Sequence, residues 1–321
     1  MSAIPDRPAL RLRTMPAALA LGLVVVLVVL NASIQDNFFA PYVIASNLTA
    51  FFPLMLIAVG QAYVVLGGSI DLSLGAIVSL VNVIVVQAVT SWGGGPWAIA
   101  GGMALGLGTG LACGIFNGAL IAGFRLQAIV TTFATGVIFG GLALKIMAQA
   151  GGALPPAYYL TYGNTYLGVP FVGWMLLLLV LGTMLVARTP FHAHMIAVGG
   201  NRVAAYQTGL SVFRTRVIGH GLAGGMAALT ALAILGVAGA GDPLMGQAFT
   251  LSSVSAIVLG GVALAGGWGS AWGAILGAAI LGLVNNLIFF ANIDYVYQSV
   301  VQGTIILVAL AAGVFFSRRP Q

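Results

Sequence analysis

The residues best suited to chemistry in this chain are polar groups set inside long apolar stretches. The segment Gly67-Gly68-Ser69-Ile70-Asp71-Leu72-Ser73 interrupts one such stretch and holds one of only five acidic residues, all of them Asp. Two adjacent glycines break a helix, and Asp71 can N-cap the next one. Two interpretations are open. The segment is either a break that lines a wet pathway, where an ionisable group marks a functional site, or a plain short turn on the cytoplasmic face.

Amide side chains form a second set of candidates. Asn117 stands beside Gly118 in one apolar segment, and Asn285 and Asn286 stand together in another. A buried amide must find hydrogen-bond partners. These amides either hold helices together through interhelical hydrogen bonds or line a pathway, and the sequence leaves both interpretations open.

Several kinds of chemistry are excluded by what the sequence lacks. The single lysine, Lys145, lies between Leu144 and Ile146, so the chain has no Walker A loop, and without Glu it has no HExxH zinc site. The one GxGxxG string, 219–224, opens an apolar stretch with no strand before it and is not a nucleotide site. His192 and His194 have no thiol or carboxylate beside them, so we expect no metal there. We predict a chain that is not an enzyme, with no catalytic residues, cofactor or metal.

The elements that position these groups follow from composition. The chain has 321 residues, of which 60% are hydrophobic and 5% are charged. A soluble domain carries about 25% charged residues, so this chain cannot cover itself with a soluble surface. Its arginines are scattered between apolar runs, which favours membrane lipid rather than nucleic acid as a partner. The one cysteine, Cys113, excludes an intramolecular disulfide.

We predict an all-α polytopic membrane protein of about ten transmembrane helices, with a broken or re-entrant segment near residues 67–75. A span needs about 20 apolar residues. Arg7, Arg11 and Arg13 before the first apolar run resemble a signal peptide, but the sequence after that run is a poor cleavage site, so we expect a retained span. The expected spans are Met15–Ile34, Leu48–Leu66, Leu72–Ser91, Trp97–Gly123, Leu126–Ala148, Leu167–Ala187, Val217–Ala238, Gln247–Ala265, Ala271–Ala291 and Val296–Phe316.

Charge placement supports this count and gives an orientation. With a cytoplasmic N-terminus, ten spans leave Asp36, Asp242 and Asp294 on the outside, and Lys145 snorkels near the outer end of its span. This is the positive-inside pattern, with both termini cytoplasmic. The division is a tail 1–14, a single membrane domain 15–316 with a cytoplasmic loop 188–216, and a tail 317–321. The basic residues on the inside are Arg7, Arg11, Arg13, Arg125, Arg188, Arg202, Arg214, Arg216, Arg318 and Arg319.

Two glycine ladders predict close helix packing. Glycines recur every fourth residue from Gly102 to Gly118, and again at Gly269, Gly273 and Gly277. Small residues at this spacing form one face on which another helix backbone can lie. We therefore expect a compact multi-helix bundle.

The longest charged loop contains a candidate docking element. A Gly199-Gly200-Asn201 turn leads into about two helical turns over 202–208, and Gly209 is placed to stop them. A short helix fixed between two spans on the cytoplasmic face can bind another protein.

Five motifs together resemble the ribose-type permeases of ABC importers, whose wider superfamily includes branched-chain amino-acid permeases. They occur in the family's order and cover Leu48 to Gln302. The motifs are Gly67–Gly75 (GGSIDLSLG), Phe116–Gln127 (FNGALIAGFRLQ) with Ala128–Ala134, Ala197–Leu210 (AVGGNRVAAYQTGL), Ala256–Gly273 (AIVLGGVALAGGWGSAWG) and Gly277–Leu287 with its Asn285-Asn286.

The resemblance implies a permease subunit in the bacterial inner membrane, working by alternating access on a small polar solute, most simply a monosaccharide. Its implied partners are a second permease subunit in a homo- or heterodimer, a cytoplasmic ATP-binding subunit with two nucleotide-binding domains, and a periplasmic solute-binding protein. Alternatives are a permease for an autoinducer-type solute, nucleoside or branched-chain amino acid, a self-powered secondary transporter, a membrane enzyme, or a structural bundle.

The resemblance also sorts the candidate residues, and this chain departs from the family in places. The family usually has Gly at Ser69, an acidic pair at Thr250 and Ser252, a basic residue at Trp268 and Gly at Asn286. These departures bear on solute preference and partner contact, and they fit one half of a heterodimer. The candidate pathway residues are Gly67, Gly68, Ser69, Asp71, Ser73, Asn117, Asn285 and Asn286. The candidate ATPase-coupling residues are Gly199, Gly200, Asn201, Arg202, Ala204, Ala205 and Gly209.

Overall fold

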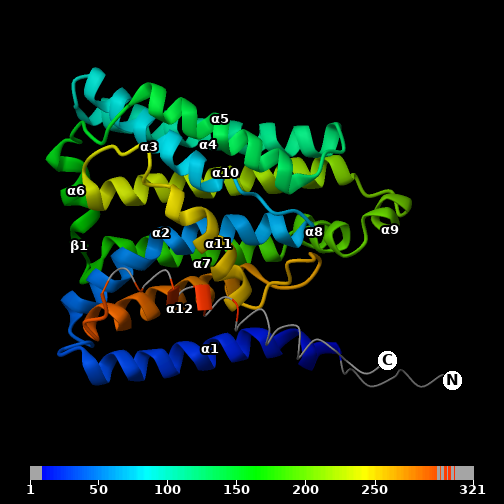
Figure 1. Ribbon diagram of the computed structural model, residues 1–321, viewed down its shortest axis with the longest axis horizontal. Coiled ribbons are helices and arrows are strands. Elements are labelled where there is room, and N and C mark those ends of the chain that lie inside the picture. Colours follow the sequence, from blue (N-terminus) through cyan, green and yellow to red (C-terminus); the bar gives the residue numbers. More distant parts are fainter. Residues whose placement is uncertain (1–8, 295–296, 298–299, 302, 305–306, 308–321) are drawn as a thin grey trace.

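The protein is a bundle whose long helices run side by side along one axis (Figure 1). The computed structural model describes residues 9–294 together with 297, 300, 301, 303, 304 and 307. Its helices are α1 Ala9–Ile34, α2 Pro41–Leu66, α3 Leu74–Ser91, α4 Pro96–Gly123, α5 Ala128–Ile146, α6 Pro156–Gly163, α7 Phe171–Ala187, α8 Pro190–Gly200, α9 Arg202–Gln207, α10 Val212–Ala238, α11 Gln247–Leu259 and α12 Ala271–Phe290. One antiparallel hairpin pairs β1 Thr165–Tyr166 with β2 Val169–Pro170.

The predicted number of spans is not confirmed. The described residues contain twelve helices, of which α2, α3, α4, α5, α10 and α12 are long and apolar enough to cross a membrane. A seventh span results if α7 and α8, bent by 72° at their junction, count as one. Helix α11 has 13 residues, which is about 20 Å of helix against a hydrocarbon core of about 30 Å. The expected span Val296–Phe316 and the tail 317–321 lie mostly or wholly outside the described residues.

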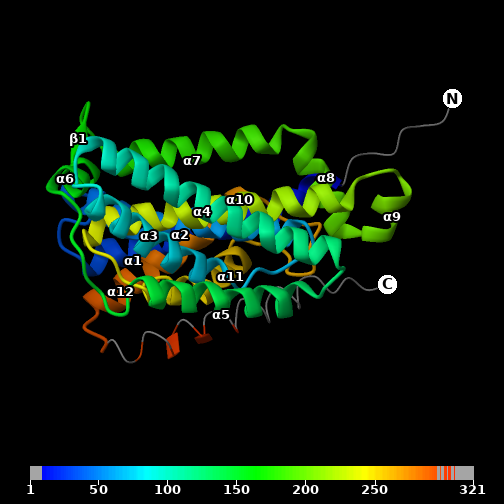
Figure 2. The same ribbon diagram turned by 90° about the horizontal axis from the view of Figure 1, so that it is seen from above.

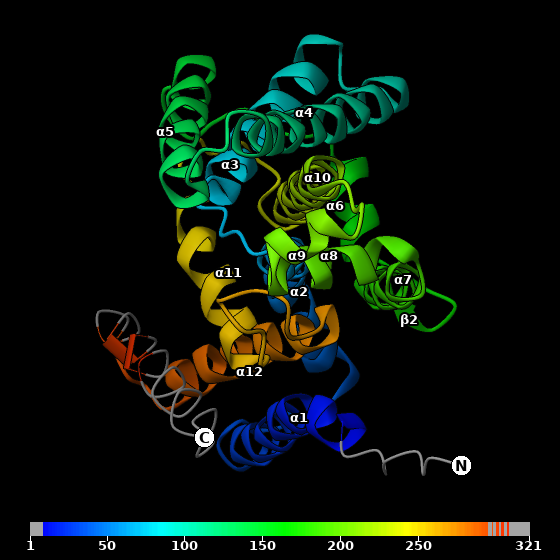
Figure 3. The same ribbon diagram turned by 90° about the vertical axis from the view of Figure 1, so that its right-hand side faces the viewer.

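Two helices, α2 and α10, occupy the centre of the bundle. Seen from one end, α3, α4 and α5 lie on one side of this pair, and α11, α12 and α1 lie on the other (Figure 3). Helix α10 packs on α4, α2 and α3, while α12 packs on α1, α2 and α11. Helices α7 and α5 form opposite flanks (Figure 2). The centre is apolar and tightly filled, with Ile57 on α2 and Leu235 on α10 wholly buried.

The glycine ladders form the predicted seams. On α4, Gly110, Gly114 and Gly118 lie directly on the backbone of α10, where an added Cβ would overlap backbone atoms. Gly102 and Gly106 of the same ladder instead face valine side chains of α3. The second ladder forms the seam between α11 and α12, since Gly273 and Gly277 lie against the carbonyl oxygens of Gly260 and Ala256.

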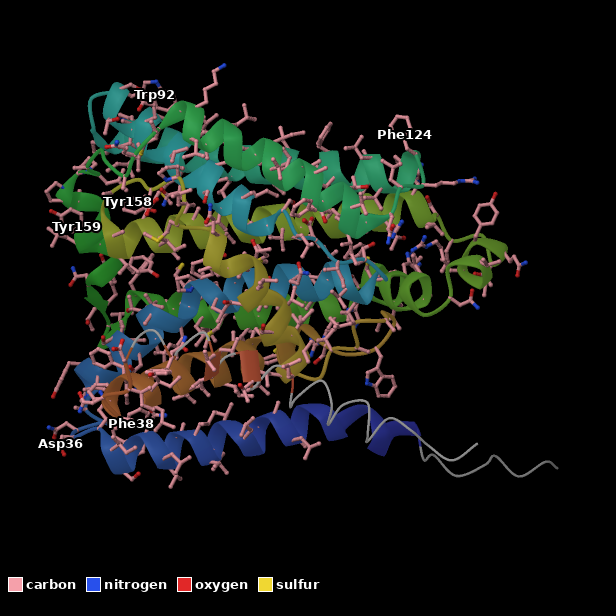
Figure 4. The ribbon with its side chains drawn as sticks, in the orientation of Figure 1. Asp36, Phe38, Trp92, Phe124, Tyr158 and Tyr159 are labelled. Carbon is pink, nitrogen blue, oxygen red and sulfur yellow. The ribbon has the colours of Figure 1, made fainter. Side chains whose placement is uncertain are left out.

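The two ends of the bundle carry different structures. One end holds α6 and the hairpin, and Asp36, Trp92, Tyr158 and Tyr159 lie there (Figure 4). The opposite end holds α8, α9, the start of α1 and Phe124 at the end of α4 (Figures 1 and 4). The chain therefore crosses between the ends with successive long helices, as the predicted topology requires.

Candidate functional site

The segment 67–73 is a non-helical connection buried inside the bundle. It leaves the end of α2 and runs back toward the middle of the molecule before α3 begins (Figure 1). Gly67, Ser69, Asp71 and Ser73 are all buried, and Asp71 has no exposed surface. Gly68 has φ +73°, a left-handed conformation that glycine adopts without strain. The segment is therefore not an exposed turn, and we call it the α2–α3 break.

Asp71 does not cap α3 as the sequence suggested. The N-cap residue is Ser73, and the Oδ1 of Asp71 accepts hydrogen bonds from the Ser73 backbone nitrogen at 2.8 Å and the Ser73 hydroxyl at 2.6 Å. The Ser73 hydroxyl in turn accepts a hydrogen bond of 2.7 Å from the Asn117 Nδ2 of α4. Asp71 stands three residues before α3, so its carboxylate holds Ser73 instead of capping the helix. Ser73 in turn joins the break to α4 through Asn117.

Two further ionisable residues join this cluster from α10. The guanidinium of Arg216 donates a 2.6 Å hydrogen bond to the Ser69 hydroxyl. One turn later, the Nδ1 of His220 lies 2.9 Å from the carbonyl oxygen of Arg216. Both side chains are buried, with 5% and 1% of their surface exposed.

The sequence prediction missed Arg216 because it placed the start of this helix too late, and it missed His220 because no charged partner was evident in the sequence. We expected a span from Val217 and counted Arg216 among the loop arginines. Helix α10 begins at Val212 because Ser211 caps it, accepting a hydrogen bond from the Arg214 nitrogen at 3.3 Å. The spacing of four between Arg216 and His220 was the available signal, since it places both on one helix face.

The cluster has unused hydrogen-bonding capacity. Among the described residues, no hydrogen-bond partner reaches the Oδ2 of Asp71, the Nε2 of His220 or the Nε of Arg216. The Oδ1 of Asn117 has the same status. Buried polar atoms in folded proteins are nearly always satisfied, so this concentration of exceptions distinguishes the cluster from an ordinary helix seam.

The break also touches α5. The Leu72 nitrogen donates a 3.0 Å hydrogen bond to the Thr132 hydroxyl, and Gly136 lies against the Ser73 backbone. A hydroxyl and a glycine thus hold the middle of the break without adding charge.

Glycines join the break to the candidate coupling segment. A Cβ on Gly199 would overlap the carbonyl oxygen of Leu66, and one on Gly68 would lie 3.1 Å from the Gly199 Cα. The loop before α12 closes this contact, since the Gly267 nitrogen donates to the Leu66 carbonyl at 3.1 Å. We call this contact of Gly68, Gly199 and Gly267 the glycine junction. It brings one predicted pathway residue and one predicted coupling residue into direct backbone contact.

The expected Gly-Gly-Asn turn is wrong in one respect. Gly199 and Gly200 are the last residues of α8, so only Asn201 separates α8 from α9. The reason is that Gly199 serves the close approach to Leu66 at the end of α2 rather than a change of direction. Asn201 caps α9, accepting from the Ala204 nitrogen at 3.0 Å.

Helix α9 projects from the end of the bundle as a small exposed element (Figure 1). Gly209 ends it as predicted, with φ +82° and a 3.0 Å hydrogen bond from its nitrogen to the Tyr206 carbonyl. Arg202 and Ala204 are exposed, while Ala205 is buried against the bundle. The helix therefore leaves one charged and apolar face exposed and packs the other against its own bundle.

Asn285 and Asn286 lie apart from the cluster. They stand on α12, where the Asn286 Nδ2 donates a 3.0 Å hydrogen bond to the Gln35 Oε1 just after α1. Beside them, the Asn31 Nδ2 donates to the Leu283 carbonyl at 3.1 Å. The structure thus brings Gly67, Gly68, Ser69, Asp71, Ser73 and Asn117 together and leaves the α12 amides at the seam with α1.

The remaining departures from the resembled family occupy different places. Thr250 on α11 lies against Gly75 at the start of α3, and the Ser252 hydroxyl donates to the Ala248 carbonyl within its own helix. Trp268 lies in the loop before α12 and is 40% exposed. Within the described part of the chain, no three His, Cys or Asp side chains are grouped to hold a metal ion.

Tyrosines of α6 cover the C-terminal part of α10. The Tyr158 hydroxyl donates to the Leu232 carbonyl at 2.9 Å, and the Tyr162 ring fills the space left by Gly236. Burial raises the pKa of both phenols well above its ordinary value, so both stay neutral.

Comparison with known proteins places this architecture in a family. Residues 43–310 match the model of the permease component of branched-chain amino acid transport systems. The ribose import permease protein of Bacillus subtilis (strain 168) is 33% identical over 289 residues, which cover 89% of this chain and 88% of the relative. The L-arabinose ABC transporter permease protein of Azospirillum brasilense is 30% identical, covering 90% and 86%. The autoinducer 2 import system permease protein of Photorhabdus laumondii is 30% identical, covering 80% and 77%.

Proposed function

Because the chain belongs to the family of permease components of branched-chain amino acid transport systems, we propose that it is the membrane-spanning permease subunit of an ATP-binding-cassette importer. The solute is a small polar molecule, and a monosaccharide is the best fit. Two of the named relatives are permeases for ribose and arabinose. The subunit is not itself catalytic, and ATP hydrolysis takes place on a separate partner chain.

One observation carries the mechanism, namely the glycine junction. Helix α9 is exposed and can contact a partner. Just before it, Gly199 in the last turn of α8 lies on the backbone at the end of α2, where the break begins. With no side chain between them, a displacement of α8 moves the break directly, since close-packed backbone cannot absorb it. This route supports a role for 199–209 as the contact with the ATPase subunit.

Transport then follows an alternating-access cycle. ATP binding closes the paired ATPase domains, which push on α9 of each permease subunit, and the permease pair opens toward the outside. Solute delivered by a periplasmic binding protein enters between the two permeases. ATP hydrolysis reverses the movement and releases the solute inward. The second permease is either another copy of this chain or a diverged partner.

The orientation we propose places α8 and α9 in the cytoplasm. That end of the described chain carries Arg188, Arg202 and Arg214, whereas Asp36 lies at the opposite end (Figure 4). Arginine retained on the cytoplasmic side is the main determinant of topology. The end with α6 and the hairpin then faces the binding protein in the periplasm, and both termini are cytoplasmic.

The chemistry of the break suits a neutral, hydroxyl-rich solute rather than a charged one. Its hydroxyls and amides both donate and accept, while its charged groups are engaged inside the protein. An autoinducer-type solute shares this chemistry, in keeping with the third relative named above. The gradient-driven alternative has weaker support, because coupling ions need intramembrane charges exposed to a pathway.

The test is reconstitution in lipid vesicles. The permease is combined with its ATPase subunit, the second permease and the binding protein, and uptake of labelled ribose, arabinose and autoinducer 2 is measured. We expect uptake only with ATP and an active ATPase, and none by the chain alone. A complex with an ATPase inactivated at its nucleotide site is the control. Gradient-driven uptake by the chain alone would overturn the proposal.

The docking role of α9 has its own test. Arg202→Ala removes an exposed charge from α9, and Arg188→Ala removes an equally exposed charge from the end of α7. We expect Arg202→Ala to weaken co-purification with the ATPase subunit, while Arg188→Ala retains it. Equal retention by both variants would remove α9 from the interface.

A further inference from the structure

We infer that Arg216 and His220 of α10 act together with Asp71 as a buried electrostatic coupling network that sets the position of the α2–α3 break. The inference rests on the proposed function, since it concerns how movement of the permease is transmitted. It assigns positioning roles to two residues outside both the α9 docking element and the glycine junction. The network works through the break and does not require contact with solute.

The first support is connectivity. The Ser69 hydroxyl accepts a hydrogen bond from Arg216. Two residues further along the break, Asp71 accepts a hydrogen bond from the Ser73 hydroxyl. Ser73 is bonded to Asn117 on α4. Besides its contact with Thr132 of α5, the break is therefore held at two points by side chains of α10 and α4. Rotation or translation of α10 relative to α4 changes the separation of those two points and must bend the segment between them.

The second support is rigidity between the two helices. Gly114 and Gly118 of α4 lie on the backbone of α10 at His220 and Val217, so no side chain cushions this contact. Such packed interfaces switch between discrete arrangements instead of deforming gradually. The arrangement of α10 on α4 therefore changes in a discrete step, and each step gives a different separation of Arg216 and Asn117.

The third support is charge. Arg216, His220 and Asp71 are each at least nine-tenths buried, and a buried charge is costly unless it is paired. Asp71 and Arg216 each use one side of their charged group in a bond to a serine and leave the other side without a partner among the described residues. His220 also has one free ring nitrogen there. The Arg216 Nε is a donor, whereas the Asp71 Oδ2 is an acceptor, so a shift of the break can exchange serine contacts for direct contacts of Arg216 with Asp71 or with the free His220 ring nitrogen.

The fourth support is location. Arg216 follows the α8–α9 segment by a few residues and belongs to the first turns of α10. A push on α9 thus reaches the break by two routes, through the glycine junction and through α10. The two routes enter the break at Gly68 and Ser69, which are adjacent. The network makes the break respond to the relative movement of α8 and α10.

The decisive variant is Arg216→Gln, with Arg214→Gln as its matched control. Arg214 lies two residues earlier on the same helix and is exposed, so its variant loses the same charge without entering the network. Both are studied in the complete vesicle-reconstituted importer. We expect Arg216→Gln to assemble and hydrolyse ATP but to lose at least about tenfold in solute imported per ATP, while Arg214→Gln stays within about twofold of the unchanged protein.

A labelling experiment separates coupling from simple stability. With Cys113 replaced by Ser, Ile70→Cys places one thiol in the break, and its maleimide labelling is compared with and without a non-hydrolysable ATP analogue. We expect a nucleotide-dependent change in labelling that Arg216→Gln and His220→Gln abolish and Arg214→Gln preserves. If every variant shows the same change as the unchanged protein, the network is overturned. It is also overturned if Arg216→Gln alters import per ATP and thermal unfolding in parallel while the labelling change persists.

The outcomes distinguish this inference from the proposed function. If the unchanged complex shows no ATP-dependent uptake, the importer assignment fails. If the unchanged complex transports and Arg216→Gln and His220→Gln transport equally well per ATP, only the network fails. Arg216→Lys adds a further check, because it keeps the charge but loses the fork of donors. We expect it to restore part of the import that Arg216→Gln loses.

Discussion

The α2–α3 break and the α1–α12 seam both place amides and other polar groups among apolar helices, yet they are built differently. At the seam, Asn31 and Asn286 each donate one hydrogen bond across to a neighbouring helix or segment, and they stand on regular helical backbone. At the break, the backbone itself is non-helical, and side chains or backbone from α4, α5, α8 and α10 converge on it. We therefore expect the polar side chains gathered around the buried irregular backbone to matter more for transport than the amides on the regular helices of the seam.

The largest difference in unfolding temperature and uptake is expected between alanine variants of two adjacent glycines, Gly199 and Gly200. Gly199→Ala puts a Cβ into the Leu66 carbonyl, while Gly200→Ala meets its nearest neighbour, the Gly267 Cα, at 3.9 Å. Overpacking of this kind costs about 1–3 kcal/mol. We expect Gly199→Ala to unfold at a clearly lower temperature in detergent and to lose most uptake, and Gly200→Ala to behave like the unchanged protein. Equal behaviour of the two variants would remove the glycine junction from the transport route.

The second prediction concerns Asp71. Asp71→Asn keeps the shape and the contact with Ser73 but removes the buried negative charge. We expect uptake to fall by about tenfold or more, equivalent to at least about 1.4 kcal/mol in the rate-limiting barrier. Asp36→Asn, which changes an exposed residue after α1, is the control and should have no effect. Uptake at the unchanged level would leave Asp71 with only a local structural role.

The third prediction uses a departure from the resembled family. Ser69→Gly restores the residue that such permeases usually have and deletes the hydrogen bond from Arg216. Because Arg216 then loses one charge-assisted bond, we expect uptake to fall by about two- to fivefold. Ser69→Thr retains the hydroxyl and should fall less. If Ser69→Gly matches or exceeds the unchanged protein, the Ser69–Arg216 bond does not contribute to coupling.

The sequence predicted the interruption near 67–75, the glycine seams and a short helix over 202–208, which is observed over 202–207, because glycines, caps and hydrophobic periodicity act locally. It did not predict that Gly199 would meet Leu66, or that Arg216 would enter the bundle and bond Ser69. Those contacts join residues more than 130 positions apart. The predicted number of spans is not confirmed among the described residues, in part because only 13 residues of the expected span Gln247–Ala265 form the helix α11. The sequence shows how long each apolar run is. Tertiary packing decides that residues 239–246 and 260–270 of these runs form loops instead of helix.

The smallest effect on uptake is expected at the α1–α12 seam. It tests whether the seam differs from the α2–α3 break in function as well as in structure. Asn286→Ala removes the bond to Gln35 without touching the break. Hydrogen bonds between membrane helices contribute about 0.6 kcal/mol on average, so we expect a small fall in unfolding temperature and uptake within about twofold of the unchanged protein. Gln35→Ala should have the same effect, and the double variant should add little, because both changes delete one bond. A loss of uptake as large as that of Asp71→Asn, with the unfolding temperature unchanged, would instead place the α12 amides on the transport route and make the seam a second functional region.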